Sequence, residues 1–325
     1  MSALPMPEAD SVDRPNFFRT ELQKSNRARP LILAHRGDSF HAPENTLEAA
    51  RLAWESGADA WELDVQLTRD GVPVVVHDDS LLRTTNVRDR FPSDPRGAAG
   101  YLVADFDLGE LRSLDAGSWF LASHGARTAG AFETLAGLSP SLRNRYRSGD
   151  VRIPTLAEAL KLTIELDWYV NIEVKSFPYT NQCLLDAVLD LIHVTGAAFR
   201  VLISSFDHTD LVRTIQSHPE IATGVLTVTR LAHPHSYVKQ NIGADFYHPS
   251  IEALGSRSHD YRTRPATNSL HKDDIEALRS DGIPILTYTV NETGREGLAV
   301  HLAEAGVSGI FTDDPARMRT LFGGR

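Results

Sequence analysis

The sequence predicts a parallel (β/α)8 TIM barrel with a subdomain inserted after its second strand and the β-hairpin that follows. Short apolar runs alternate with helical patterns along most of the 325 residues, which is typical of strands joined by helices. Eight strands remain once the hairpin is set apart, and reactive polar residues stand at the ends of several of them. An open doubly wound sheet would favour a glycine-rich phosphate loop after the first strand, where this chain has His35-Arg36-Gly37.

Composition narrows the class of protein. The chain is long enough for one barrel of about 250 residues with additions. A formal charge of −10 argues against a nucleic-acid partner. The single Cys183 excludes an internal disulfide, no apolar run approaches the ~20 residues of a membrane span, and the N-terminus lacks the pattern of a signal peptide. We therefore expect a cytoplasmic protein without an integral membrane segment; composition leaves its oligomeric state open.

The first elements can be placed in order along the chain. Residues 1–29 carry prolines, mixed charges and no lasting periodicity, so we expect an N-terminal extension that lies mostly outside the core, apart from a short helix around Phe17–Leu22. The first strand, Leu31–His35, is apolar until its last residue, as expected when both faces are covered. A helix over Asn45–Ser56 follows, with Asn45 or Thr46 as its cap.

The second strand, Ala60–Gln66, leads into a hairpin. An Asp-Gly pair at positions 70–71 lies between two β-rich runs, which is a strong short-range hairpin signal. Taking these two residues as the turn places Asp64 opposite His77. Because the return strand is antiparallel, we interpret it as a ribbon that projects from the rim and not as a strand of the barrel.

The alternation of strands and helices breaks off from about residue 80 to 152 and then resumes. That stretch is rich in Arg, Gly, Ser and Asp, and insertions in this fold collect in the loops at the catalytic end. We predict that it is an inserted subdomain covering the barrel mouth and governing which substrates enter, within a catalytic domain spanning 30–325. Beyond a capping box at Thr155–Glu158, strands are predicted at Tyr169–Lys175, Val201–Phe206, Gly224–Val228, Asp245–Pro249, Ile285–Val290 and Gly309–Thr312, and helices at about 180–194, 208–217, 233–240, 271–280 and 294–304.

Three carboxylates stand near the ends of two neighbouring strands. Side chains alternate across a strand, so Glu62 and Asp64 share one face of the second strand and Glu173 shares a face with Lys175 on the third. Three such charges in a semi-buried mouth would repel one another strongly without a cation. Oxygen ligands favour a hard metal ion. The sequence therefore predicts one divalent cation, Mg²⁺ or Ca²⁺.

Other reactive residues complete a possible catalytic set. Imidazole exchanges protons near neutral pH, so His35 and His77 are candidates for a general acid and a general base. Arg36 and Lys175 add positive charge suited to a phosphate. Together with a metal they describe phosphodiester hydrolysis, although ion pairing of the carboxylates with Arg36 and Lys175 as scaffolding is an open alternative. Further residues that could line the pocket are Glu44, Phe206 and Tyr288.

The motifs that carry this chemistry also resemble a known family. HRG at 35–37, APENT at 42–46, ELDVQLTRDGVPVVVHDD at 62–79, NIEVK at 171–175 and GIFTDDP at 309–315 are similar to the motif series of the glycerophosphodiester phosphodiesterase family, from about residue 31 to 317. The resemblance implies hydrolysis of a glycerophosphodiester to glycerol 3-phosphate and an alcohol, a reaction of lipid and glycerol metabolism. By motif, His35 and His77 match the acid/base pair, Glu62, Asp64 and Glu173 match the metal ligands, and Arg36 and Lys175 match the phosphate contacts.

Two other functions use similar residues. A phospholipase-D-like barrel acting on lysophospholipids shares the two histidines and the carboxylates but yields a cyclic phosphate. A non-catalytic phosphate-binding barrel would tolerate loss of one of these residues, whereas this chain has every one. The LDAGSWF segment at 114–120 and the lack of a disulfide pair favour the hydrolase. Tyr288, where the family commonly has Trp, and the polar stretch 252–268 depart from its pattern and leave the preferred head group open.

Overall fold

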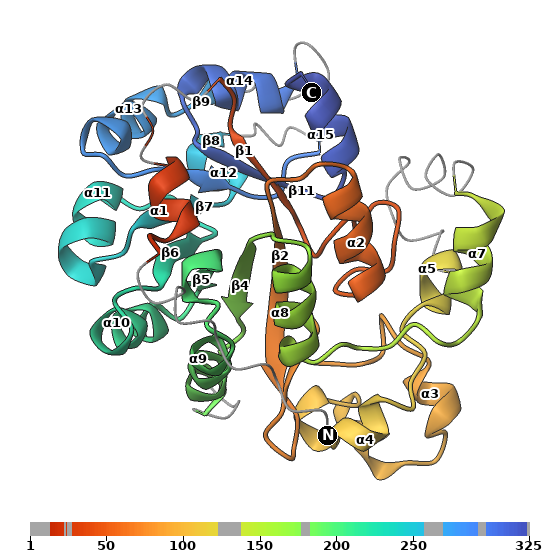
Figure 1. Cartoon of the computed structure of the whole chain (residues 1–325). Helices are drawn as coiled ribbons and strands as arrows, with labels where there is room; N and C mark the ends of the chain where they lie inside the picture. Colours follow the sequence, from red (N-terminus) through yellow and green to blue (C-terminus); the bar gives the residue numbers. More distant parts are fainter. Residues whose placement is uncertain are drawn as a thin grey trace.

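A computed structural model describes residues 14–22, 24, 28–122, 138–176, 183–256, 269–291 and 297–323. Within them, eight parallel strands form a nearly closed barrel, which confirms the predicted fold class (Figure 1). Hydrogen-bonded neighbours follow the order β10-β11-β1-β2-β4-β5-β6-β7, and bridges of Tyr247 with Ile285 and of Ser250 with Tyr288 join the two ends. The strands are β1 (Leu31–Ala34), β2 (Ala60–Leu67), β4 (Val170–Val174), β5 (Val201–Ser205), β6 (Ala222–Thr227), β7 (Phe246–Pro249), β10 (Leu286–Thr287) and β11 (Gly309–Thr312).

Helices surround the strands, and their ends follow local capping chemistry (Figure 1). The Thr46 side chain accepts a hydrogen bond from the Ala49 amide at the start of α2, and Thr155 with Glu158 forms the expected capping box of α8. Every helix in the described ranges is too short or too polar to cross a bilayer. Around the barrel lie α2 (Leu47–Glu55), α8 (Leu156–Glu165), α9 (Leu184–Thr195), α10 (His208–Ser217), α11 (Pro234–Ser236), α12 (Ile251–Leu254), α13 (Lys272–Ser280), α14 (Leu298–Ala305) and α15 (Pro315–Leu321).

The predictions for the second half of the chain are met closely, with a few differences at the ends of elements. The expected helix at 233–240 is α11 followed by a π-helical turn, Tyr237–Ile242. The expected starts of two helices at 180 and 294 lie outside the described residues, as does most of the polar stretch 252–268. Its described ends include a two-stranded antiparallel ladder of β8 (Gly255–Ser256) and β9 (Ser269–Leu270).

The hairpin is present, but the predicted register is wrong by one residue. Strand β3 (Pro73–Val75) pairs with β2 so that Val65 lies opposite Val75, and the Asp64 carbonyl accepts from the Val76 amide and not from His77. The turn has three residues, because the Thr68 amide donates to the Val72 carbonyl at 3.1 Å. Gly71 closes this turn with φ +80°, a left-handed conformation that glycine adopts without strain.

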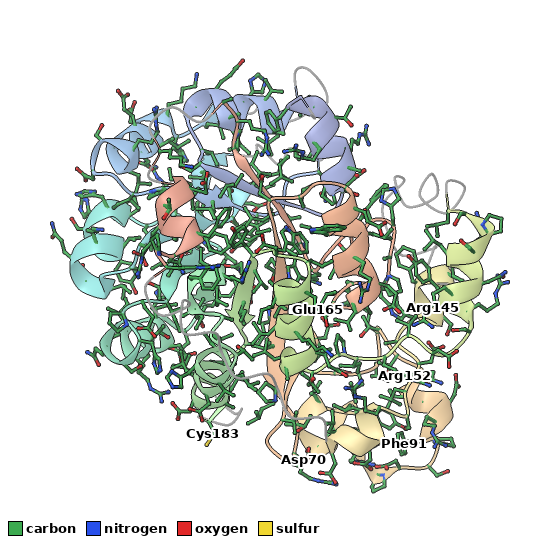
Figure 2. The ribbon with its side chains drawn as sticks, in the orientation of Figure 1. Asp70, Phe91, Arg145, Arg152, Glu165 and Cys183 are labelled. Atoms are coloured by element: carbon green, nitrogen blue, oxygen red, sulfur yellow. The ribbon has the colours of Figure 1, made fainter. Side chains whose placement is uncertain are left out.

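The segment between β3 and α8 packs around a hydrophobic cluster of its own. Side chains such as Leu81, Phe106 and Leu114 bury against Val74 and Val76 at the hairpin. Figure 1 shows its helices grouped to one side of the barrel, and Figure 2 shows Asp70 at the hairpin tip beside them. They are α3 (Val87–Arg90), α4 (Leu108–Leu111), α5 (Ser118–Ala122), α7 (Pro140–Arg147) and the short 3-10 turns Pro95–Ala99 and Val103–Asp105. The domain limits at 29, 80 and 152 stay predictions.

The short helix α1 (Phe17–Leu22) closes the amino end of the barrel. Phe18 is fully buried and packs with Leu22 in a cluster of apolar side chains contributed by the barrel strands. The Asn16 side chain donates to the carbonyls of Ala198 and Val201, both at 2.9 Å. The short helix predicted around Phe17–Leu22 is therefore present, and it packs in the core.

Candidate active site

Three carboxylates meet inside the carboxyl end of the barrel. Strands β2 and β4 are in register so that Asp64 pairs with Glu173, while Glu62 lies one pleat earlier opposite Asn171. Alternate residues of a strand share a face, so Glu62 and Asp64 project the same way. One oxygen from each of Glu62, Asp64 and Glu173 lies within 4.8 Å of the other two. The backbone register thus brings together the three predicted ligands.

Two cations lie directly against this carboxylate cluster. Lys175 Nζ is 2.7 Å from Glu173 Oε1 and 3.4 Å from Asp64 Oδ1. Arg36 Nε is 3.4 Å from Asp64 Oδ2, and the Arg36 amide, in a left-handed conformation with φ 58°, donates to Glu62 Oε2 at 2.8 Å. The ion pairing that the sequence left open as an alternative is therefore present, and it places both cations beside the carboxylates.

The cluster carries more negative charge than these contacts satisfy. Burial, followed by repulsion from Asp64 and Glu173, raises the pKa of Glu62 well above its usual range. Burial also raises the pKa of Glu173. Burial would raise the pKa of Asp64 as well, but Arg36 and Lys175 outweigh it and lower that pKa.

Two oxygens of the cluster fit a divalent cation. Glu62 Oε1 and Asp64 Oδ1 are buried and form no hydrogen bond among the described residues; the Lys175 ammonium 3.4 Å from Asp64 Oδ1 is an ion-pair contact. Carboxylate oxygens left without donors in a buried site are costly unless a charge of opposite sign meets them. An all-oxygen set of this kind matches a hard cation and not a thiophilic metal.

His35 follows β1 and contacts a carboxylate that sequence reasoning missed. Its Nδ1 lies 2.7 Å from Asp313 Oδ1. Asp313 follows β11, which pairs with β1 so that Ala34 lies opposite Thr312. The next residue of each strand is then His35 and Asp313, so the register of two adjacent strands creates the contact.

His77 has a different carboxylate partner, and that partner belongs to a chain of charges. Its Nδ1 lies 2.7 Å from Asp78 Oδ1, and Asp78 accepts from Arg83 at 2.5 and 2.9 Å. Arg83 also donates to the buried Glu44, which in turn accepts from Arg36 at 2.7 Å. A positive charge on His77 would favour the ionised forms of Asp64 and Glu173.

Two aromatic side chains border the cluster. Phe206 follows β5 and is 45% exposed, and Tyr288 follows β10; their rings pack edge to face with centroids 6.2 Å apart. The Tyr288 hydroxyl donates to the Thr227 carbonyl at 2.8 Å. Burial, followed by the negative charge of Glu173, raises the pKa of Tyr288.

Four residues that hold the site were not identified from the sequence. Asn45 donates to Asp64 Oδ2 at 2.8 Å, although its position predicted only a possible helix cap. The other three are Asp78 and Asp313, which lie inside the motifs at 62–79 and 309–315 but were given no role there, and Arg83, which lies outside the quoted motifs. Two of these residues could have been found from their proximity to a candidate histidine. Asp78 is next to His77 in the sequence, and Asp313 follows the strand that pairs with the strand before His35.

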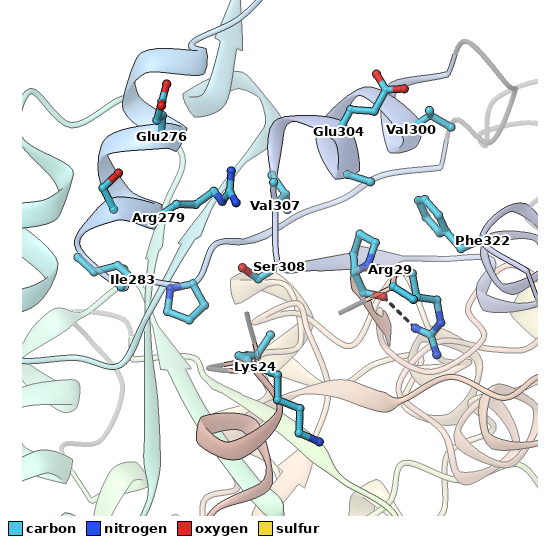
Figure 3. Close-up of a pocket in the computed structure, with 18 residues that line it drawn as sticks. Lys24, Arg29, Glu276, Arg279, Ile283, Val300, Glu304, Val307, Ser308 and Phe322 are labelled. Carbon is cyan, nitrogen blue, oxygen red and sulfur yellow. Dashed lines mark hydrogen bonds between the residues drawn. The ribbon is translucent and has the colours of Figure 1, made fainter. Parts of the chain in front are cut away.

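A hollow lies at the amino end of the barrel, opposite the carboxylate cluster (Figure 3). Its lining includes Pro30, Pro284 and Ser308, which precede β1, β10 and β11 respectively. Charges of both signs, such as Arg279 and Glu304, line it as well. The ten predicted site residues all fall in the described ranges, and none of them lines this hollow, so we place the chemistry at the carboxyl end.

Known proteins resemble this chain over most of its length. The family model described as Glycerophosphoryl diester phosphodiesterase family matches residues 35–317. A glycerophosphodiester phosphodiesterase of Caldanaerobacter subterraneus subsp. tengcongensis is 33% identical over 297 residues, which cover 90% of this chain and 98% of that protein. Another, of Bacillus altitudinis, is 34% identical over 287 residues, which cover 88% of this chain and 95% of that protein.

A solved structure agrees with these relatives. The phosphodiesterase of Oleispira antarctica, in complex with its product sn-glycerol-3-phosphate, is 25% identical to this chain and superposes with a TM-score of 0.69. The match covers 90% of this chain and 96% of that one.

Proposed function

Because the chain belongs to the glycerophosphoryl diester phosphodiesterase family and is a phosphoric diester hydrolase, we propose that it cleaves glycerophosphodiesters to sn-glycerol 3-phosphate and an alcohol with one divalent cation and two histidines. The observation that carries the proposal is the buried cluster of Glu62, Asp64 and Glu173, with two oxygens that form no hydrogen bond among the described residues. The product found in the Oleispira antarctica phosphodiesterase supports this choice of substrate.

Glu62, Asp64 and Glu173 would hold the cation, which we propose to be Mg²⁺ or Ca²⁺ because every ligand is a carboxylate oxygen. When bound, such an ion supplies a positive charge that polarises a phosphoryl oxygen. Asn45 keeps Asp64 in place through its bond to Oδ2, so Asp64 Oδ1 is the oxygen available for ligation. The Arg36 amide constrains Glu62 in the same way through Oε2.

Arg36 and Lys175 would contact the phosphate. Both are already held beside the carboxylates, and each side chain has more donors than these contacts use. Glu44 is buried between Arg36 and Arg83, so we propose that it orients Arg36. Phe206 and Tyr288 would line the side of the pocket that takes the alcohol.

The two histidines divide the proton transfers. One removes the proton of the glycerol 2-hydroxyl as that oxygen attacks phosphorus, and the other protonates the departing alkoxide as its bond to phosphorus breaks. A cyclic phosphate results. The roles then reverse, so that water loses a proton as it opens the ring and the 2-oxygen regains one.

The direct test is turnover of glycerophosphocholine by the full chain, followed by phosphorus NMR. We expect glycerol 3-phosphate as the final product. Accumulation of a cyclic phosphate would instead indicate the phospholipase-D-like reaction, and binding without turnover would indicate a phosphate-binding barrel. Glu62→Gln should abolish the reaction, whereas the matched control Glu48→Gln, which changes an acid paired with Arg145 on the outside of α2, should not.

Three further expectations stay predictions: the cytoplasmic location and the absence of a nucleic-acid partner, both from composition, and a role in lipid and glycerol metabolism, from the family resemblance.

A further inference from the structure

Asp313 is held in one orientation by neutral donors. Its Oδ1 accepts from the Ser39 hydroxyl at 2.9 Å as well as contacting His35. Its Oδ2 accepts from Asn291 Nδ2 at 2.7 Å, and its own amide donates back to Asn291 Oδ1 at 3.0 Å. Both carboxylate oxygens are therefore fixed by groups that carry no charge of their own.

This arrangement determines which nitrogen of His35 is free. Burial alone would raise the pKa of Asp313, but its contacts with His35, Asn291 and Ser39 outweigh burial and lower that pKa below the usual aspartate range. An ionised carboxylate can only accept hydrogen bonds, so the proton in the contact belongs to His35 Nδ1. Nε2 is then the nitrogen that can exchange a proton with a substrate.

The carboxylate beside His77 is in a different position. Asp78 accepts two bonds from Arg83, so a cation shares its charge. In the described part of the chain, Asp313 makes no ion pair with Lys or Arg. Only the Asp313 carboxylate therefore faces its histidine without a competing positive partner.

We propose that Asp313 is a positioning residue for catalysis: it fixes the Nδ1–H tautomer and the ring orientation of His35, so that Nε2 faces the reacting phosphodiester. Asn291 and Ser39 support it by holding the carboxylate. The inference rests on the proposed acid/base role of His35. It adds a residue that contacts no substrate and acts only through the imidazole.

The test compares Asp313→Asn with the neighbouring variant Asp314→Asn. Asn removes the charge of Asp313 at nearly constant size, and loss of a carboxylate behind a catalytic histidine costs about 10²–10⁴-fold in turnover. We expect kcat on glycerophosphocholine to fall by that factor while KM changes by less than about threefold. Asp314 caps α15 through the Arg317 amide, and Asn caps a helix equally well, so its variant should retain wild-type kcat.

Two further measurements separate this inference from the function on which it rests. The double variant His35→Ala/Asp313→Asn should be no slower than His35→Ala, because Asp313 acts through that ring. Wild-type kcat in Asp313→Asn, with His35→Ala impaired, overturns the role of Asp313 and leaves the proposed function intact. Wild-type kcat in His35→Ala overturns the acid/base role itself.

Nitrogen-15 NMR of the histidine rings in the wild-type full chain supplies a readout other than activity. We expect His35 to carry its proton on Nδ1, with the resonance assigned by its loss in His35→Gln. A proton on Nε2 would overturn the proposal.

Discussion

The two ends of the barrel lumen are built from opposite kinds of side chain, often by the same strand. On β2, Ala60 packs in the apolar cluster at the amino end, and Glu62 and Asp64 on the same face enter the carboxylate cluster two and four residues later. On β1, Leu31 and Leu33 are apolar and His35 follows them. The comparison teaches that stability and chemistry are separated along each strand, so a substitution at one end should spare the property supplied by the other.

The largest effect should come from removing the cation from the carboxyl end. We expect EDTA to abolish turnover, and Mg²⁺ or Ca²⁺ to restore it, because three buried carboxylates then lose their proposed counter-charge. The barrel should remain folded, since its amino-end cluster is untouched. Release of glycerol 3-phosphate and circular dichroism on the same samples check both parts. Full activity after exhaustive dialysis against EDTA would contradict the metal assignment.

The next largest effect should come from either histidine. His35→Ala and His77→Ala should each lose about 10²–10⁴-fold in turnover of a natural diester, with little change in the denaturant midpoint. A p-nitrophenyl ester has a leaving group that needs no proton, so it should rescue the variant that lacks the acid and leave the other slow. Steady-state rates on both substrates measure this. Two variants within about threefold of wild type would exclude the two-histidine mechanism.

At the amino end, the effect should be on stability alone. Phe18→Ala removes a fully buried ring and should lower the free energy of unfolding by about 3–5 kcal/mol. Turnover per folded molecule should be unchanged, because α1 lies at the opposite end from the carboxylates. Urea titration gives the first quantity and active-site-normalised rates the second. Val228→Ala, at a side chain 60% exposed, is the control and should shift stability by less than about 0.5 kcal/mol.

Smaller effects, on both stability and turnover, are expected from replacing Arg83, which links the segment after the hairpin to the site. Arg83→Gln removes two hydrogen bonds to the buried Glu44 carboxylate, so we expect about 1–3 kcal/mol lower stability. The turnover number should fall about tenfold or less, because Asp78 keeps its contact with His77. Arg88→Gln on α3 is the matched control. Loss of turnover equal to that of His77→Ala would mean that Arg83 takes part in the chemistry.

Much of this site was predictable because its information is local. Alternation along β2 was sufficient to place Glu62 and Asp64 on one face, and the polar end of an apolar run identified His35. The hairpin register was missed because the Asp-Gly pair suits a two-residue turn equally well. The Thr68 hydroxyl, which accepts a hydrogen bond from the Val72 amide at 2.9 Å, favours the three-residue turn instead. The bonds of Asn16, just before α1, to carbonyls 182 and 185 residues away could not be predicted, because the local sequence carries no information about such distant partners.

Asp313 was beyond local reasoning for a related cause. It lies 278 residues from His35, and the contact exists only because the last barrel strand pairs with the first. A sequence pattern can indicate that both residues end strands. It cannot indicate which strand ends become neighbours until the order of strands around the barrel is known.

The pairing of Leu31 with Gly309 also fixes when the site can form. A ribosome delivers β1 among the first strands and β11 last, so one edge of β1 has no strand to pair with until nearly the whole chain has emerged. Such long-range closure is slow, because the chain loses the entropy of closing a long loop before the contacts between the two strands can stabilise it. His35 gains Asp313 in that same step. We therefore expect the rate at which enzyme activity recovers during refolding to report the pairing of the last strand with the first. Recovery of the helical circular dichroism signal should report earlier events.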